Sequence, residues 1–260
     1  MSKNVIFCYS GSGNCLDIAK NIASYLTDTD VIMMRSAPVK TDVTDAKRVG
    51  FVFPCYAGGL PGDVEKFVSQ IKLAPDAYTF GVCSYAGYPG IGLSLIHRLV
   101  HLDYWAHISH HCSCIWLLPH RLMLPPMSVE KAQARSKKLC RKIAYDILDG
   151  RRKDKAPSAN PLNALEAKAW PRLKDLKAAK MTVSDACVGC GQCARLCPRG
   201  NIRIEKGRAG FGASCIGCLS CLQYCPQHAI SMGGATLTRE HYHNPNVTAD
   251  MLCQTLIHID

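Results

Sequence analysis

Hydrophobic positions in the first 150 residues follow two alternating patterns. Short continuous apolar runs predict buried strands at Asn4–Tyr9, Val31–Met34, Val49–Phe53, Tyr78–Cys83 and Cys112–Leu117. Between them, apolar residues recur at intervals of three and four. This spacing predicts four helices. The first is Cys15–Leu26, the second begins near Asp63, the third runs from after residue 90 to about Leu102, and the fourth is Val129–Leu148. We therefore expect an α/β fold: a doubly wound, five-stranded parallel sheet covered by helices on both faces.

Small and polar residues follow three of these strands. The first strand ends in Ser10–Cys15, the third in Pro54–Gly62 and the fourth in Ser84–Gly90. Ligands in such sheets bind at the carboxyl ends of the strands, where the strand order reverses. We therefore expect the binding site at these three loops.

The pattern changes again beyond residue 150. Residues 151–181 hold three prolines and a short amphipathic helix expected at Leu162–Trp170. From Cys187 onward cysteine and glycine dominate, with strand-like stretches at Asn201–Ile204 and Ala229–Ser231. We divide the chain into a sheet domain (1–150), a basic connector (151–181), a cysteine-rich domain (182–233) and a C-terminal tail (234–260).

Two cysteine runs of identical spacing give the strongest chemical signal. They are Cys187, Cys190, Cys193, Cys197 before Pro198, and Cys215, Cys218, Cys221, Cys225 before Pro226. Three thiolates spaced by three residues, with a distant fourth, suit a [4Fe–4S] cube, whereas zinc usually takes two separated pairs. The last cysteine of each run reaches the other cluster. We therefore expect a first cysteine set (Cys187, Cys190, Cys193, Cys225) and a second cysteine set (Cys197, Cys215, Cys218, Cys221). Zinc or purely structural thiols are the alternatives.

These runs resemble those of bacterial two-cluster ferredoxins. The resemblance covers about residues 182–233 and includes both prolines and the strand-like stretch after each of them. It implies a small α+β ferredoxin domain with two [4Fe–4S] clusters.

The loop Ser10-Gly11-Ser12-Gly13-Asn14-Cys15 lies between a strand and a helix. Backbone N–H groups and small hydroxyls at such a position bind phosphate. The lysine of a nucleotide-binding P-loop is missing, so we exclude that motif. A dinucleotide fingerprint lacks its third glycine, which Leu16 replaces. Arg35, at the end of the second strand, could contact a 2′-phosphate, so NADP stays an alternative, as does a plain helix cap.

The segment Tyr9–Asn14 is similar to the phosphate loop of flavodoxins, which implies FMN. Cys15 stands where flavodoxins usually have threonine. The resemblance also implies two loops that contact the flavin ring, with Tyr56, Tyr85 and Tyr88 as stacking candidates. Their residues are Pro54, Cys55, Tyr56, Ala57, Gly58, Gly59, Ser84, Tyr85, Ala86, Gly87, Tyr88 and Gly90.

Taken whole, the chain resembles the flavodoxin–ferredoxin fusions of anaerobic bacteria and archaea, through the entry to the ferredoxin (Lys180–Ile204) and the tail residues Tyr242–Val247. This implies an electron-transfer protein with FMN and two [4Fe–4S] clusters that supplies a redox protein partner, a ferredoxin or a reductase. One alternative is an FMN-dependent reductase that acts directly on a small substrate. Another is an iron–sulfur module without flavin. The residues do not determine an oligomeric state.

Composition narrows the setting. Sixteen cysteines and no recognisable secretory signal near Met1 favour metal binding in the cytoplasm over a disulfide framework. The stretch Ala77–His97 is free of Asp, Glu, Lys and Arg but rich in glycine, so we expect no membrane span. Histidines at 97, 101, 107, 110 and 111 are weak metal candidates, because no glutamate accompanies the first two as in zinc peptidases.

The formal charge is +11, and the connector 151–181 carries more than half of it. The connector is either a solvated linker or a docking surface for acidic partners or cofactors. No nucleic-acid recognition module is visible, so we expect no nucleic-acid partner.

Overall fold

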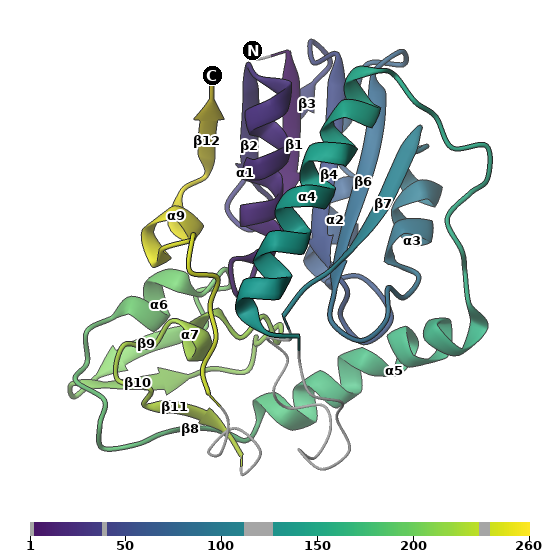
Figure 1. Cartoon of the computed structure of the whole chain (residues 1–260). Helices are drawn as coiled ribbons and strands as arrows, with labels where there is room; N and C mark the ends of the chain where they lie inside the picture. The colour runs from purple at the N-terminus through teal and green to yellow at the C-terminus, as the bar shows by residue number, and fades with distance from the viewer. Residues whose placement is uncertain (1–2, 38–40, 112–126, 234–239) are drawn as a thin grey trace.

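A six-stranded sheet forms the core of the larger unit (Figure 1). The structure is a computed structural model and describes residues 3–37, 41–111, 127–233 and 240–260. In spatial order the strands are β12 (Leu256–Ile259), β2 (Thr29–Met33), β1 (Asn4–Cys8), β4 (Arg48–Pro54), β6 (Tyr78–Tyr85) and β7 (Tyr104–Ser109). The last five are parallel, and β12 pairs antiparallel with β2. In chain order the parallel strands run 2-1-3-4-5, the flavodoxin-like order.

The fifth parallel strand differs from the sequence expectation. It is β7, which pairs with β6 from Phe80 with Tyr104 to Tyr85 with Ser109. Its sequence, YWAHIS, contains a histidine and a serine and so lacks a continuous apolar run. The expected strand Cys112–Leu117 lies outside the described residues.

Helices cover both faces of the sheet. On one face lie α1 (Asn14–Leu26) and α4 (Val129–Leu148), and on the other α2 (Gly62–Val68) and α3 (Gly92–Leu99) (Figure 1). Alternate residues of β1 serve the two cores: Ile6 packs with the α1 and α4 side, Phe7 with the α2 and α3 side. Two short parallel strands, β3 (Asp42–Val43) and β5 (Lys72–Leu73), pair apart from the main sheet.

The cysteine-rich unit lies at the carboxyl ends of the parallel strands (Figure 1). It consists of two antiparallel strand pairs and two short helices. These are β8 (Met181–Val183) with β11 (Ile230–Met232), β9 (Ile202–Glu205) with β10 (Arg208–Phe211), α6 (Gln192–Leu196) and α7 (Ser220–Gln223). Its apolar core includes Ala57 from the larger unit and Trp170 from the connector.

The connector helix is longer than expected. Instead of ending at Trp170, α5 spans Pro161–Ala178 and continues through Pro171. Contacts on both sides of the proline hold it in place: Trp170 is buried against Tyr56, and Lys174 Nζ donates a hydrogen bond of 2.7 Å to the Cys215 carbonyl.

The C-terminal tail joins both units. Its helix α9 (Ala249–Cys253) packs against α6, and β12 adds an antiparallel edge strand next to β2. The sequence does not indicate that the tail enters the sheet. Among the helices of the described residues, none combines the length and apolarity that crossing a bilayer requires.

Candidate functional site: the cysteine sets and the loops of the sheet

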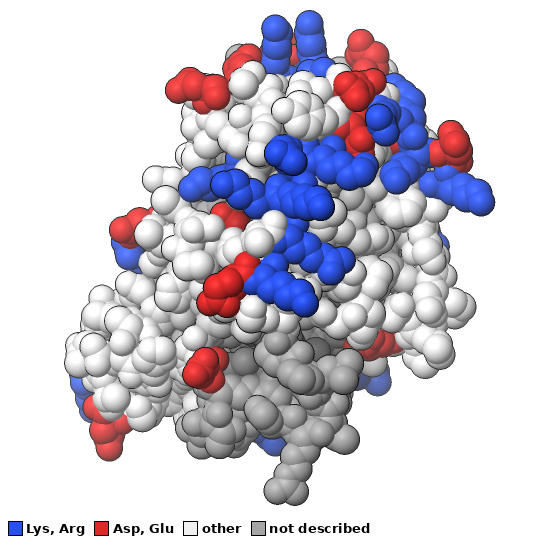
Figure 2. All heavy atoms as spheres, in the orientation of Figure 1, with Lys and Arg blue, Asp and Glu red and all other residues white. Residues whose placement is uncertain are grey.

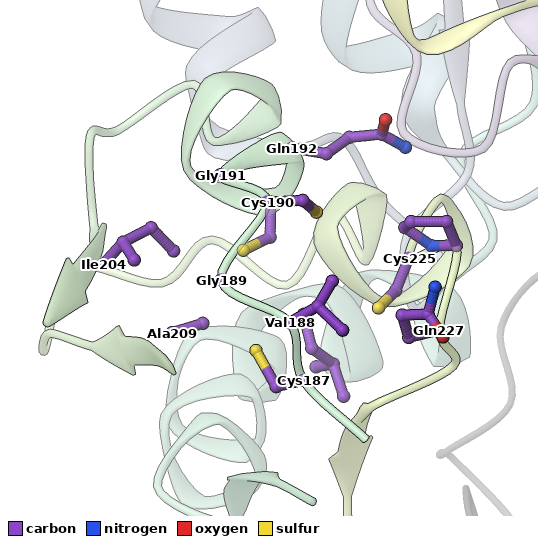
Figure 3. A pocket seen from close by; sticks show the side chains of 13 residues that line it. Cys187, Val188, Gly189, Cys190, Gly191, Gln192, Ile204, Ala209, Cys225 and Gln227 are labelled. Atoms are coloured by element: carbon purple, nitrogen blue, oxygen red, sulfur yellow. The ribbon is translucent and has the colours of Figure 1, made fainter. Parts of the chain in front are cut away.

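The first cysteine set lines one pocket. Cys187, Cys190 and Cys193 come from the segment that enters α6, and Cys225 faces them from the end of α7 (Figure 3). Apolar residues complete the wall, among them Ile204, Ala209 and Ile230. The last cysteine of the second run thus lies with the first three of the first run, as the crossed assignment requires.

The second cysteine set is brought together deeper in the unit. Burial raises the pKa of the Cys221 thiol well above its ordinary value, and the negative charge of neighbouring thiolates raises it further. Those neighbours include the other three members of the set, Cys218, Cys215 and Cys197. Isolated thiols in such a place stay protonated, whereas a bound metal cluster replaces the protons.

The internal repeat places the same hydrogen bonds in both halves. The N–H two residues after the first cysteine donates to that cysteine, and the N–H four residues after the last cysteine donates to the last. The pairs are Gly189 with Cys187, Gly217 with Cys215, Asn201 with Cys197, and Ala229 with Cys225. Such N–H groups lower the pKa of the Cys187 thiol, and they stabilise a coordinating thiolate in the same way.

The spacing of the thiols suits a cluster rather than a single ion. Four thiolates on one zinc ion would lie about 3.8 Å apart, given Zn–S bonds of about 2.3 Å. Within the described ranges, no three His, Cys, Asp or Glu side chains come together closely enough to hold one metal ion. The first set instead surrounds a pocket, which fits a group larger than one ion, such as a cluster whose corners are each bound by one thiolate.

The phosphate-like loop lies at the switch point between β1 and β4. Gly13 precedes α1 with φ 96°, a left-handed conformation that favours glycine, and its N–H donates to Ser10 Oγ at 3.1 Å. Residues 10–15 are all buried. The Tyr9 hydroxyl is also buried and has no hydrogen-bond partner among the described residues. The loop thus combines a helix N-terminus, two hydroxyl side chains and an unpaired phenol.

The two loops expected at the flavin ring lie against each other. The Cys55 N–H donates to the Ser84 carbonyl at 2.7 Å, and the Ile91 N–H donates to the Gly58 carbonyl at 2.7 Å. Residues 86–88 are exposed, whereas Tyr85 turns toward His107 of β7. All three polar loops therefore meet at one edge of the sheet.

Helix α5 covers these loops, which the sequence did not indicate. The Trp170 and Tyr56 ring centroids are 6.2 Å apart, and Glu166 accepts a hydrogen bond from the Tyr88 hydroxyl. A Cβ on Gly59 would come within 2.7 Å of the Ala167 Cβ, so backbone and helix are in direct contact.

The phosphate-like loop touches the second cysteine set. A Cβ on Gly11 would lie 2.2 Å from the Cys218 carbonyl oxygen, so only glycine permits this approach. Ser220 Oγ donates to the Gly11 carbonyl at 2.9 Å. Arg35 donates to the Ser10 and Leu196 carbonyls, across the same boundary. The sequence indicates Arg35 only as a candidate contact for a 2′-phosphate, and no sequence pattern marks Ser220.

The tail covers the other side of the same loop. The Asn244 N–H donates to the Ser12 carbonyl at 2.8 Å, and the Tyr242 hydroxyl donates to Asn14 Oδ1 at 2.7 Å. Tyr242 and Asn244 belong to a tail segment that had no assigned role, and only the folded chain shows what they contact.

Residues 179–226 match the family described as 4Fe-4S dicluster domain. The smaller unit is a two-cluster iron–sulfur domain. The matched residues include all eight cysteines of both runs, and two [4Fe–4S] clusters require eight thiolate ligands. No curated protein matches the chain.

Several solved structures resemble the N-terminal part of the chain. Rubredoxin:oxygen oxidoreductase from Desulfovibrio gigas matches 57% of this chain and 37% of its own, at 13% identity and TM-score 0.39. A flavodoxin from Archaea matches 56% and 99%, at 16% identity and TM-score 0.34. An FMN-dependent NADH-azoreductase from Bacillus anthracis matches 56% and 99%, at 9% identity and TM-score 0.39. At these distances the flavodoxin-like assignment rests on the strand order of the chain itself.

Proposed function

We propose that this chain transfers electrons between the two clusters of its dicluster domain and an FMN bound at the loops after β1, β4 and β6. The contact between Gly11 and Cys218 carries the proposal, because a residue of the phosphate-like loop touches the backbone of a cluster cysteine. When bound, FMN accepts one or two electrons, whereas each cluster accepts one. The arrangement would make the chain an adapter between one-electron and two-electron partners.

The residues of the loop fit FMN in their chemistry. Ser10, Ser12 and the first turn of α1 offer donors to a phosphate, and no carboxylate lies between Tyr9 and Asn14. The buried Tyr9 hydroxyl offers a further polar group. The tail and the second-set loop enclose this site and would keep water from the cofactor.

The two cysteine sets differ in exposure, which supports an order of transfer. Cys190 of the first set is exposed, and Val188 beside it is 65% exposed. The second set lies against the phosphate-like loop. Electrons from a protein partner would therefore enter at the first set and reach the flavin through the second.

The surface charge supports an acidic redox partner. Six exposed basic side chains lie on α4, and Figure 2 shows Lys and Arg gathered over this face. They are Lys131, Arg135, Lys137, Lys138, Arg141 and Lys142. Basic charge thus extends well beyond the connector, and it would steer an acidic protein toward the chain.

Helix α5 favours a carrier over a reductase that acts on a small substrate. It lies on Gly58 and Gly59, where a substrate would have to approach the flavin ring. The backbone at Gly58 and Gly59 is therefore covered by the chain itself.

The first experiment is anaerobic purification with iron, sulfide and FMN analysis. We expect about eight iron, eight sulfide and one FMN per chain. Reduction of the clusters by a one-electron donor should then bleach the flavin within the same molecule. Eight iron without FMN, even after reconstitution, would contradict the flavin part of the proposal. Turnover of a quinone or a nitro compound at a rate matching cluster reoxidation would instead favour the reductase.

A further inference from the structure

A buried hydroxyl links the phosphate-like loop to the second cysteine set. Ser220 is fully buried at the start of α7, and its Oγ lies 2.9 Å from the Gly11 carbonyl oxygen and 3.5 Å from Cys218 Sγ. Both atoms are acceptors, and the hydroxyl has one proton. Ser220 can therefore donate either to the sheet unit or to a cluster ligand, but not to both at full strength.

Arg35 supplies the charge in this network. Its guanidinium donates to Ser220 Oγ at 3.3 Å and to the Ser10 carbonyl at 3.2 Å, and it also donates to the Leu196 carbonyl. These three acceptors are neutral oxygens, so the hydrogen bonds leave the positive charge uncompensated. Leu196 directly precedes Cys197 of the second set. The charge is therefore held beside the second set. Because Arg35 donates to the Ser220 oxygen, the Ser220 hydroxyl proton remains available for the Gly11 carbonyl or for Cys218 Sγ.

Among the described residues, the first cysteine set has no equivalent hydroxyl, and the cation near it, Arg208, is paired with Asp185. The repeat aligns Ser220 with Gln192, each directly before the third cysteine of its run. The Gln192 side chain donates to the Tyr224 carbonyl, not to a cysteine sulfur. The two halves thus share their backbone N–H to sulfur bonds but differ at this position.

We propose that Ser220 and Arg35 set the reduction potential of the second-set cluster above that of the first. A hydrogen bond to a coordinating sulfur and a nearby positive charge both stabilise the more negative, reduced cluster. The reaction concerned is the transfer of one electron from the reduced first cluster to the second. No covalent bond forms or breaks, and the hydroxyl keeps its proton while it turns toward Cys218. The inference rests on the cysteine assignment of the proposed function.

The test is a redox titration of the holoprotein followed by electron paramagnetic resonance. Ser220→Ala should lower the potential of the second-set cluster and leave the first unchanged. We expect about a tenfold change in its ratio of reduced to oxidised form at a fixed potential, or about 59 mV. Ser220→Thr keeps the hydroxyl and should restore the potential. Ser214→Ala, an exposed serine beside Cys215, is the matched control.

Arg35 gives an independent measurement. Arg35→Gln should lower the same potential, whereas Arg35→Lys keeps the charge and should lower it less. Arg199→Gln is the control, because Arg199 also lies near the end of α6 but its charge is paired with Asp63. If Ser220→Ala fails to retain the second cluster, the potential measured in Arg35→Gln decides for or against the proposal. Unchanged potentials, equal shifts of both clusters or equal loss of both would overturn it.

The outcomes separate this inference from the proposed function. A protein without FMN whose second-set potential still shifts in Ser220→Ala would keep the role of Ser220 and refute the flavin proposal. A protein with one FMN whose potentials do not shift in Ser220→Ala would keep the flavin proposal and refute the role of Ser220.

Discussion

At the scale of single residues, Cys225 connects the two halves of the iron–sulfur domain. It belongs to the second run, yet its side chain lines the pocket of the first three cysteines of the first run. The Ala229 N–H donates to its sulfur at 3.4 Å. One cysteine thus ties the end of α7 to the segment before α6.

Cys225→Ser should disturb the cluster of the first set and spare the second. The serine oxygen is a poorer ligand for iron than a thiolate, and its bonds are shorter. Spectroscopy of the reduced variant should show one altered cluster, and iron analysis should fall toward half if that cluster is lost. Damage confined to the second set would contradict the crossed assignment. Cys253→Ser, outside both sets, is the control.

His110 makes stability depend on pH. Burial, and secondarily the nearby His111, lower the pKa of this imidazole to about 4. Its Nδ1 accepts the His111 N–H at 2.9 Å. Below pH 6.5 this histidine is protonated in the unfolded chain, whereas in the folded chain it stays neutral down to about pH 4. This contribution to stability is complete above pH 6.5 and is lost as the pH falls toward 4.

His110→Asn should remove this dependence. The asparagine oxygen can accept the same N–H but takes up no proton in this range. The difference in unfolding free energy between pH 7 and pH 4 should shrink by about 3 kcal/mol relative to the parent. Urea unfolding at both pH values measures it. An unchanged difference, equal to that of the exposed control His101→Asn, would refute the role of His110.

At the scale of elements, β12 protects the edge of the sheet. It pairs antiparallel with β2, and His258 Nδ1 lies 2.8 Å from the Asp30 carboxylate. Hydrogen bonding to Asp30 raises the pKa of the histidine above 6.5. The ion pair therefore stabilises the strand pair fully below pH 6.5, and the contribution fades as the pH rises through the raised pKa.

Hydrogen exchange should report this change at the edge strand. Amides of β12 and β2 should lose protection between pH 6 and pH 8, after correction for intrinsic rates. The change should be modest because the histidine is partly exposed. In His258→Gln the protection should be lower at pH 6 and independent of pH. Equal pH dependence in the variant and the parent would show that another group is responsible.

At the scale of the whole molecule, the two units meet through backbone contact. Gly11 of the larger unit lies against the Cys218 carbonyl, and the tail residues Tyr242 and Asn244 hold Asn14 from the other side. Helix α5 closes the third side through Trp170. The site is therefore assembled from the sheet, the connector, the iron–sulfur domain and the tail together.

Gly11→Ala should force the two units apart at this contact. The new methyl would come within 2.2 Å of the Cys218 oxygen, and backbone cannot yield as a flexible side chain does. We expect a loss of about 1–3 kcal/mol in unfolding free energy, together with slower flavin reduction by the clusters. Gly210→Ala, where a Cβ would meet only the Arg203 carbonyl oxygen at 3.8 Å, should leave both unchanged. Parent-like stability and rates in Gly11→Ala would contradict the contact.

The sequence by itself determined the features that depend on local spacing. The strands and helices around β1, β4, β6 and α4 follow from the period of their apolar residues, and α4 has the predicted bounds. Cysteine spacing indicated the dicluster domain, which the family match confirms.

Tertiary structure decided the rest, because those features depend on contacts between distant segments. Strand β7 carries a weak apolar pattern and is defined by its pairing with β6. Helix α5 passes Pro171 because Trp170 and Lys174 hold it on the two sides of the proline. Ser220 and Arg35 are 185 residues apart, and no local pattern relates them. Only folding brings their side chains to the same boundary between the sheet and the clusters.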